Sequence, residues 1–212
     1  MNPITMYREL AAAGTMLASY PLDYLIRLGL PVGIRLSRDA VILSHGLGGD
    51  RTNLAALAAW VRLAGFNNVH FFEYPTRQPI DESAAKLVEM IARNDAGSGI
   101  HLIGHSLGGT ISRIAASRIA AANISESVVR SLVTLAAPYQ HSEPNRHEIA
   151  DRHEIAIFGD EDPIVRPPGN EHRGVFKRIA VLRNTGHLGV LYHPETIRIT
   201  LSELWESRVR GA

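Results

Sequence analysis

The sequence predicts an α/β fold in which an open, mostly parallel sheet of about six strands carries helices on both faces. From Asp39 onward, short β-branched runs alternate with longer segments whose apolar residues recur at helical spacing, as in a parallel sheet with crossover helices. The connections are short, so no separate cap domain fits between the elements. A chain of 212 residues, 45% hydrophobic and with a net charge of +1, suits one soluble core. We therefore expect a helical segment over residues 1–38, packed on a single domain that comprises residues 39–212.

Six β-branched runs predict the strands, and four longer segments predict the helices between them. The expected strands cover residues 40–44, 69–73, 100–103, 131–135, 154–158 and 179–182. The expected helices cover residues 54–64, 82–93, 107–122 and 195–207. Because parallel strands end at one edge of a sheet, and ligands bind at that edge in open α/β folds, we expect the functional side chains just after the strands.

Apolar residues in the first thirty positions recur at helical spacing and predict two short helices packed on the core. A contact with a membrane surface or with a second copy of the chain is the alternative use of these apolar faces. The apolar positions are Met6, Leu10, Ala13 and Leu17, followed by Leu22, Leu25 and Ile26.

This N-terminal segment predicts neither a membrane span nor a signal peptide. Pro21, Asp23 and Arg27 interrupt the apolar stretch over residues 10–30, and no uncharged run reaches the roughly 18 residues that a spanning helix needs. No small-x-small cleavage site follows the alanine-rich part. We expect a cytoplasmic protein, with at most a weak contact between its N-terminal segment and a membrane surface.

The composition excludes several kinds of chemistry. The chain has no cysteine, which excludes disulfides, thiolate metal sites and a cysteine nucleophile, and its near-neutral charge does not suit nucleic-acid binding. His147 and His153 each precede a glutamate, but Asp151 stands four residues after His147, so the His-Glu-x-x-His spacing of a zinc helix is missing. We expect no metal site, and a solvated loop over residues 139–152 that is too short to cover an active site.

The candidate nucleophile is Ser106, in the stretch Gly104-His-Ser106-Leu-Gly108 between an apolar strand and a helical pattern. Glycines two positions before and after the serine let strand and helix approach closely, and the strained turn presents the hydroxyl. The alternative role for this serine is that of a helix cap. A serine hydroxyl needs an imidazole to take its proton and a carboxylate to orient that imidazole.

Among the ten histidines, His187 is the preferred base because it alone follows a late strand on a glycine-containing loop. His193 and His172 are the rivals, each with a surface position near a turn as its alternative. His70 and His101 lie within expected strands, where a buried or hydrogen-bonded structural imidazole is the better interpretation.

The preferred carboxylate is Asp162, on the turn after the fifth expected strand. Pro163 biases the backbone of Asp162 towards an extended conformation, which turns its side chain inward. Asp160 is the alternative acid, and Glu161 is expected in the solvated part of the turn. The order serine, acid, histidine along the chain is one of the three orders known for such triads.

The loop His45-Gly-Leu47-Gly-Gly49 follows the first expected strand and frees backbone N–H groups to point into a cavity. No Gly-Lys-Ser/Thr sequence follows, so a phosphate-binding loop is not indicated. We expect an oxyanion hole in which the backbone N–H groups of Leu47 and Leu107 are the donors.

Taken together, these motifs make the sequence similar to the α/β-hydrolase superfamily, and within it to small lidless bacterial lipases and esterases. The resemblance covers about residues 39–205 and leaves the N-terminal segment outside. It implies that Ser106 is the nucleophile, His187 the general base and then acid, and Asp162 its orienting carboxylate. The motifs are His45–Gly49, Gly104–Gly109, Thr134–Pro138, Gly159–Val165 and Gly186–His187.

The expected reaction is hydrolysis of a small acyl ester or a lipid through an acyl-enzyme, without a cofactor. A thioesterase or amide hydrolase on the same scaffold is the first alternative. The second alternative is a non-catalytic binding protein, which would require that one position of the triad be missing. Apolar residues near the motifs are candidates for an acyl pocket, with core packing as their alternative: Leu47, Leu107, Ile164, Leu188 and Val190.

Overall fold

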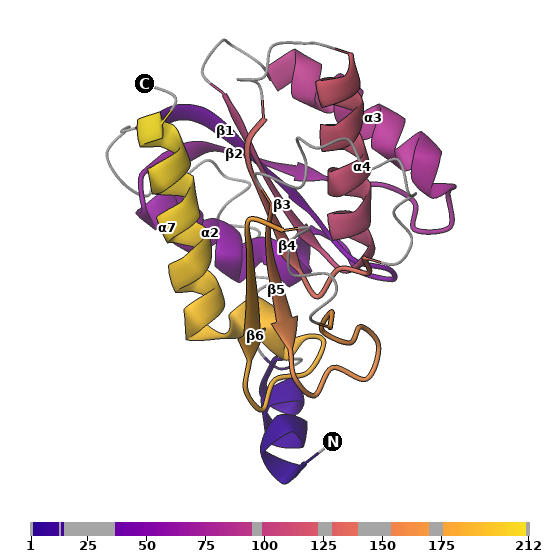
Figure 1. Ribbon diagram of the computed structural model, residues 1–212, viewed down its shortest axis with the longest axis vertical. Helices are drawn as coiled ribbons and strands as arrows, with labels where there is room; N and C mark the ends of the chain where they lie inside the picture. Colours follow the sequence, from indigo (N-terminus) through magenta and orange to yellow (C-terminus); the bar gives the residue numbers. More distant parts are fainter. Residues whose placement is uncertain are drawn as a thin grey trace.

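The computed structural model describes residues 2–12, 14, 37–94, 99–122, 129–139, 154–169 and 176–210. Within these ranges, six strands form one all-parallel sheet in the order β2-β1-β3-β4-β5-β6 (Figure 1). This confirms the predicted open, parallel α/β sheet. The strands are β1 (Ser37–Ser44), β2 (Phe66–Phe72), β3 (Ile100–His105), β4 (Val129–Leu135), β5 (Glu154–Gly159) and β6 (Arg178–Leu182).

The helices between the strands lie where helical spacing predicts them, and one short helix, α6, was not expected. The predicted helix over residues 54–64 begins with a 3-10 turn, η1, in which the Asp50 side chain accepts from the N–H of Thr52. An N-terminal helix over residues 3–12 precedes the sheet. The others are η1 (Arg51–Leu54), α2 (Ala55–Leu63), α3 (Ile80–Asn94), α4 (Leu107–Ala121), α6 (Gly189–Tyr192) and α7 (Pro194–Arg210).

Local sequence accounts for the ends of these helices. Asp81 and Glu82 lie in the first turn of α3 and Arg93 in its last turn, where each charge complements the helix dipole. Helix α7 begins at Pro194, a residue suited to the first helical position because the N–H that it lacks has no helical partner there.

Helices cover both faces of the sheet, as the alternation of strands and helices predicts. Val41 and Leu43 of β1 pack in one cluster with α2, α6 and α7, whereas Ala40 and Ile42 pack in another with α3 and α4. Figure 1 shows α2 and α7 on one side of the sheet and α3 and α4 on the other. The alternation of side chains along a strand explains why consecutive residues of β1 enter different cores.

The N-terminal helix forms as predicted, but it presents its apolar residues to solvent. Met6 and Leu10 are 52% and 66% exposed, whereas Thr5 and Ala12 are buried. The expectation that Met6 and Leu10 pack on the core is therefore wrong. The second expected N-terminal helix lies outside the described residues, and the division of the chain at residue 38 stays a prediction.

No helix in the described ranges combines the length and the apolar character that crossing a bilayer requires.

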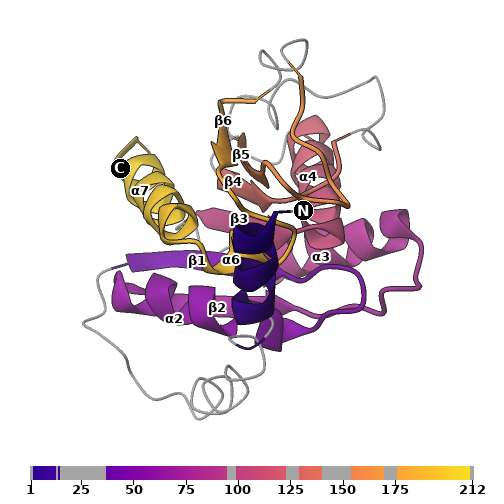
Figure 2. The same cartoon turned by 90° about the horizontal axis from the view of Figure 1, so that it is seen from below.

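The strand register brings distant loops to one edge of the sheet. Ser44 pairs with Gly104, His105 with Leu135, and Gly159 with Leu182. The loops that carry the candidate site residues therefore start side by side at the carboxyl ends of the strands. Seen towards this edge in Figure 2, the N-terminal helix lies across it beside α6.

Candidate active site

Ser106 stands on a strained turn between β3 and α4. Its φ of 52° and ψ of −122° lie in a region that non-glycine residues rarely adopt, at a cost of about 1–3 kcal/mol. Its backbone N–H donates to the carbonyl of Leu135 at 2.8 Å, which ties the turn to the end of β4. This is the backbone strain that a nucleophile at a strand-to-helix turn requires.

Glycines allow the turn to pack against its neighbours, as the sequence predicts. A Cβ at Gly104 would lie 2.5 Å from the Cα of Gly109, and one at Gly108 would overlap the carbonyl oxygens of Ser44 and His45. Helix α4 therefore starts directly on the ends of β1 and β3. No residue with a side chain fits at either position without a backbone shift.

Asp162 and His187 are in direct contact. Oδ2 of Asp162 lies 2.7 Å from Nδ1 of His187, and both side chains are buried. The other carboxylate oxygen accepts from the N–H groups of Ile164 at 2.8 Å and Val165 at 2.9 Å. These bonds fix the carboxylate, which in turn favours a proton on Nδ1 and leaves Nε2 of the ring as an acceptor.

The carboxylates of Asp160 and Glu161, which precede Asp162, accept hydrogen bonds from other segments of the chain. Oδ1 of Asp160 accepts from the N–H of Thr185 at 3.2 Å, so this residue ties the acid turn to the loop that carries His187. Glu161, which is partly buried, accepts from the N–H of Asn2 at 2.8 Å, a bond that lowers the pKa of this carboxyl. Of the three acidic residues on the turn, Asp162 is thus the one against the histidine.

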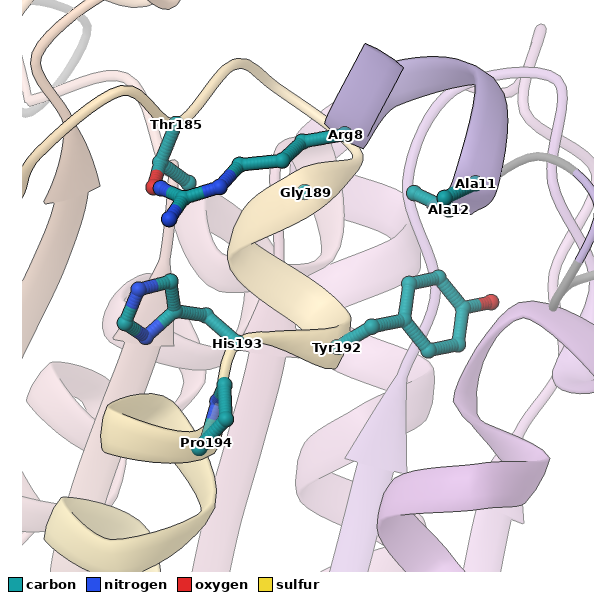
Figure 3. Close-up of a pocket in the computed structure, with 8 residues that line it drawn as sticks. All are labelled: Arg8, Ala11, Ala12, Thr185, Gly189, Tyr192, His193 and Pro194. Atoms are coloured by element: carbon teal, nitrogen blue, oxygen red, sulfur yellow. The ribbon is translucent and has the colours of Figure 1, made fainter. Parts of the chain in front are cut away.

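The rival base His193 makes no hydrogen bond with Asp162, although both residues lie in the described part of the chain. Its Nδ1 accepts from the N–H of Glu195 at 3.1 Å, and its ring lines a cavity of about 250 Å³ between the N-terminal helix and α6, with Arg8 close by (Figure 3). Burial and the charge of Arg8 lower the pKa of His193. His172 lies outside the described residues.

The strand histidines are structural, as expected. His101 is buried, with Nδ1 2.8 Å from Oγ of Ser131 and Nε2 3.3 Å from Asp39. His70 is half-buried, and its Nε2 lies 2.7 Å from the side-chain oxygen of Asn68.

His105, immediately before Ser106, is a site residue that sequence reasoning missed. Its ring centroid lies 4.9 Å from that of His187, and its Nε2 lies 3.2 Å from the carbonyl oxygen of His187. Burial and the neighbouring His187 lower the pKa of His105 to about 3. A neutral ring donates to that carbonyl through Nε2–H, so His105 attaches the loop that carries His187 to the turn that carries Ser106. Its place inside the serine motif was the only signal in the sequence.

The loop after β1 lies against Ser106. A Cβ at Gly46 would lie 3.0 Å from Cβ of Ser106, which places the adjoining peptide to Leu47 beside the serine. The ring of His45 stacks on Tyr74 at 4.5 Å, and the Tyr74 hydroxyl donates to the carbonyl of His45 at 2.6 Å. Burial raises the pKa of Tyr74, so the hydroxyl stays a donor and the loop stays anchored.

The two oxyanion donors remain predictions, with favourable positions. Leu107 is the first residue of α4, and the first N–H groups of a helix have no partner within it. Leu47 follows the glycine that contacts Ser106.

The candidate acyl-pocket residues differ in how far they are exposed to solvent. Leu47 and Ile164 are 70% and 69% exposed, and Leu107 and Leu188 are partly buried. Val190 is fully buried and belongs to the core cluster that contains α2, α6 and α7. Its assignment to the acyl pocket is therefore corrected: the core-packing alternative describes it.

In the part of the chain that the structure describes, no three histidine or acidic side chains gather as a metal site would require. His147 and His153 lie outside these residues, as does the loop over 139–152 apart from Tyr139.

The family model for lipase (class 3) matches residues 45–172, more than half of the chain. The chain belongs to the class 3 lipase family. The matched range includes Ser106 and Asp162, whereas His187 lies beyond it.

The fold of this chain is similar to those of solved hydrolases. A presumed lipase from Acinetobacter baumannii is 15% identical with a TM-score of 0.61, over 84% of this chain and 87% of that one. A thermophilic esterase from Thermogutta terrifontis is 14% identical with a TM-score of 0.57, over 80% of this chain and 90% of that one. The RedJ thioesterase of Streptomyces coelicolor is 14% identical with a TM-score of 0.57, over 81% and 86%. A search of curated proteins found no match. At these identities the likeness establishes the α/β-hydrolase fold.

Proposed function

We propose that this class 3 lipase hydrolyses carboxylic esters through an acyl-enzyme in which Ser106 is the nucleophile. One observation carries the proposal: the Asp162–His187 pair, 2.7 Å apart, packs through His105 against the strained turn of Ser106. Membership of the lipase family and the fold shared with an esterase and a thioesterase support an ester or thioester substrate.

In the first half-reaction, Oγ of Ser106 attacks the ester carbonyl while Nε2 of His187 takes the hydroxyl proton. Asp162 stabilises the imidazolium that forms, because its carboxylate accepts from Nδ1–H. The negative charge on the carbonyl oxygen is stabilised by the N–H groups of Leu47 and Leu107, each worth roughly a hundredfold to a thousandfold in rate. His187 then gives its proton to the leaving alcohol, and the acyl-enzyme remains.

In the second half-reaction, water replaces the alcohol. His187 takes a proton from the water as its oxygen attacks the acyl carbon, and the same N–H groups hold the second oxyanion. When the bond to Ser106 breaks, the proton on His187 returns to Oγ. The products are the carboxylic acid and the free enzyme, so no cofactor enters the cycle.

The acyl group is expected to be aliphatic. Leu47 and Ile164 present apolar side chains from the loops after β1 and β5, with Leu188 next to the base. A profile of p-nitrophenyl esters from acetate to palmitate would test this preference, and acyl-CoA substrates would test the thioesterase alternative. Faster hydrolysis of acyl-CoA than of every alcohol ester would make the thioesterase the better description.

Replacing the nucleophile tests the reaction itself. We expect Ser106→Ala to abolish hydrolysis of p-nitrophenyl butyrate and labelling by a fluorophosphonate. Ser112→Ala, on the same helix and with a buried hydroxyl 3.3 Å from that of Ser44, is the control and should keep both. Hydrolysis by Ser106→Ala at close to the wild-type rate would reject the proposal.

We also propose a weak contact with a lipid surface through the N-terminal helix, consistent with a cytoplasmic protein peripheral to membranes. Four apolar residues of this helix are exposed at the edge of the sheet where the site lies: Ile4, Met6, Tyr7 and Leu10. Such a face adds membrane affinity in proportion to its apolar area. Co-sedimentation with phosphatidylcholine vesicles should fall when Tyr7 and Leu10 are both replaced by serine, and unchanged sedimentation would contradict the contact.

A further inference from the structure

Glu9 of the N-terminal helix contacts the loop that carries the proposed base. Its Oε2 accepts from the N–H of Leu188 at 3.0 Å, and its Oε1 accepts from the N–H of Gly189 at 2.7 Å. These are the two residues directly after His187, at the start of α6. The carboxylate thus binds both amides that follow the histidine, from a helix almost 180 residues away in the chain.

The glycines on either side of His187 leave the space that this carboxylate occupies. A Cβ at Gly186 would lie 2.6 Å from Cδ of Glu9, and one at Gly189 would lie 2.7 Å from its Oε1. Neither glycine has a positive φ, so the backbone conformation itself does not require glycine there. The close approach of the Glu9 carboxylate is what requires glycine at both positions.

Other residues of the same helix bind both catalytic loops. Asn2 contacts the carboxylate of Glu161, next to the proposed acid, and donates to the side chain of Asn184 at 3.1 Å. Arg8 donates to the carbonyls of Arg183 at 2.6 Å and of Asn184 at 2.9 Å. The helix therefore joins the acid turn to the histidine loop on both sides of the base.

We propose that Glu9 is a positioning residue for His187, and that the N-terminal helix is a structural part of the active site. This inference rests on the proposed function. Misplacing a catalytic group by about 1 Å can cost roughly a hundredfold in rate. Without Glu9, the amides of Leu188 and Gly189 lose their acceptor, and the loop gains freedom where the orientation of the ring matters.

Kinetics of Glu9 variants test the proposal. We expect Glu9→Ala to lower kcat for p-nitrophenyl butyrate roughly 10- to 100-fold, the range that a displaced base implies, with KM changed less than about threefold. The rate of fluorophosphonate labelling should fall by the same factor as kcat, because it depends on the same base. Glu9→Gln keeps one acceptor oxygen and should lose less. Glu89→Ala, which removes an exposed carboxylate paired with Arg93 on α3, is the matched control and should leave kcat unchanged.

A double-mutant cycle separates positioning from general loss of stability. In the wild-type background, the methyl group of Gly186→Ala displaces the Glu9 carboxylate, so kcat should fall about as far as in Glu9→Ala. In the Glu9→Ala background the space is vacant, and adding Gly186→Ala should cost less than about threefold more. Mutations at residues in contact have non-additive effects of this kind, whereas the free-energy effects of mutations at independent sites add.

The outcomes distinguish this inference from the proposed function. Equal losses from Gly186→Ala in both backgrounds, or wild-type kcat in Glu9→Ala, would overturn the role of Glu9 and leave the role of Ser106 intact. Wild-type hydrolysis by Ser106→Ala would instead overturn the proposed function, and with it the reaction that Glu9 is proposed to serve.

Discussion

The sharpest test of the proposed acid is Asp162→Asn, because this substitution changes one atom that faces the histidine and keeps the rest of the turn. The retained oxygen can still accept from the N–H groups of Ile164 and Val165. The new amide nitrogen would stand where Oδ2 now lies 2.7 Å from Nδ1 of His187. Two donors cannot face each other, so the ring must move its proton to Nε2, where it can no longer accept the proton of Ser106.

The expected size of the effect follows from this exchange of tautomer. The corresponding substitution in a serine protease triad lowers kcat by about 10⁴-fold, which equals about 5.4 kcal/mol of transition-state stabilisation at about 1.36 kcal/mol per tenfold. Folding should change little, because both backbone N–H groups on the turn keep their acceptor. We therefore expect a loss of kcat near 10⁴-fold, with a thermal unfolding midpoint within a few degrees of wild type.

The assay is steady-state hydrolysis of p-nitrophenyl butyrate, with Asp160→Asn as the matched control. Asp160 accepts from the N–H of Thr185, and an asparagine oxygen can do the same, so this variant should stay within about threefold of wild type. If Asp162→Asn retained more than a tenth of wild-type kcat, or if Asp160→Asn lost as much, the assignment of the acid would be refuted.

Three other predictions concern the buried framework of the site. The pKa of His105 is about 3 in the folded protein, against an ordinary value of 6.5. Its neutral ring therefore contributes fully to the free energy of unfolding above pH 6.5, and this contribution falls by up to about 1.4 kcal/mol per pH unit between pH 6.5 and pH 3. Urea unfolding should show a smaller difference in stability between pH 7 and pH 5 for His105→Gln than for wild type. Gly108→Ala would overlap the carbonyl oxygen of His45, so its thermal midpoint should fall by at least ten degrees, with loss of fluorophosphonate labelling. Arg113 binds the buried carboxylate of Glu154 at 2.7 and 2.9 Å, and Arg113→Met would leave that charge without its ion-pair partner. We expect the free energy of unfolding in urea to fall by about 3–5 kcal/mol. Adding Glu154→Leu should recover most of that loss, and no recovery would contradict the pairing argument.

The sequence predicted the strands and most of the helices well, because these elements depend on short-range patterns. Short β-branched runs located the six strands, and helical spacing located four of the helices. Parallel pairing then required every strand to end at one edge, which is why the loops that carry Ser106 and His187 could be expected at the same edge of the sheet. The choice of Asp162 over Asp160 depended on Pro163, a local conformational cue; Asp162 contacts His187, and its catalytic role stays a prediction.

The parts that the sequence did not predict depend on long-range packing. Helical spacing identified the N-terminal helix and its apolar stripe, but it could not reveal that the helix packs through Asn2, Arg8 and Glu9. Their partners are backbone groups, the carboxylate of Glu161 and the side chain of Asn184, all more than 150 residues away, and such partners leave no periodic signal. Val190 was misassigned for a similar reason, because nearness to a motif in sequence does not say which way a short helix faces.

The proposed nucleophile and the proposed base are held by different means, and this predicts different responses to mutation. Ser106 is fixed by strained backbone between two buried elements, so changes around it should unfold the protein. His187 follows β6, an edge strand with a single neighbour, and its loop is held by Asp162 at the ring, His105 at the carbonyl and Glu9 at the next amides. Each such bond contributes about 1 kcal/mol net, too little to decide whether the domain folds but enough to decide where the ring lies. Changes at the histidine loop should therefore reduce kcat in a protein that remains folded.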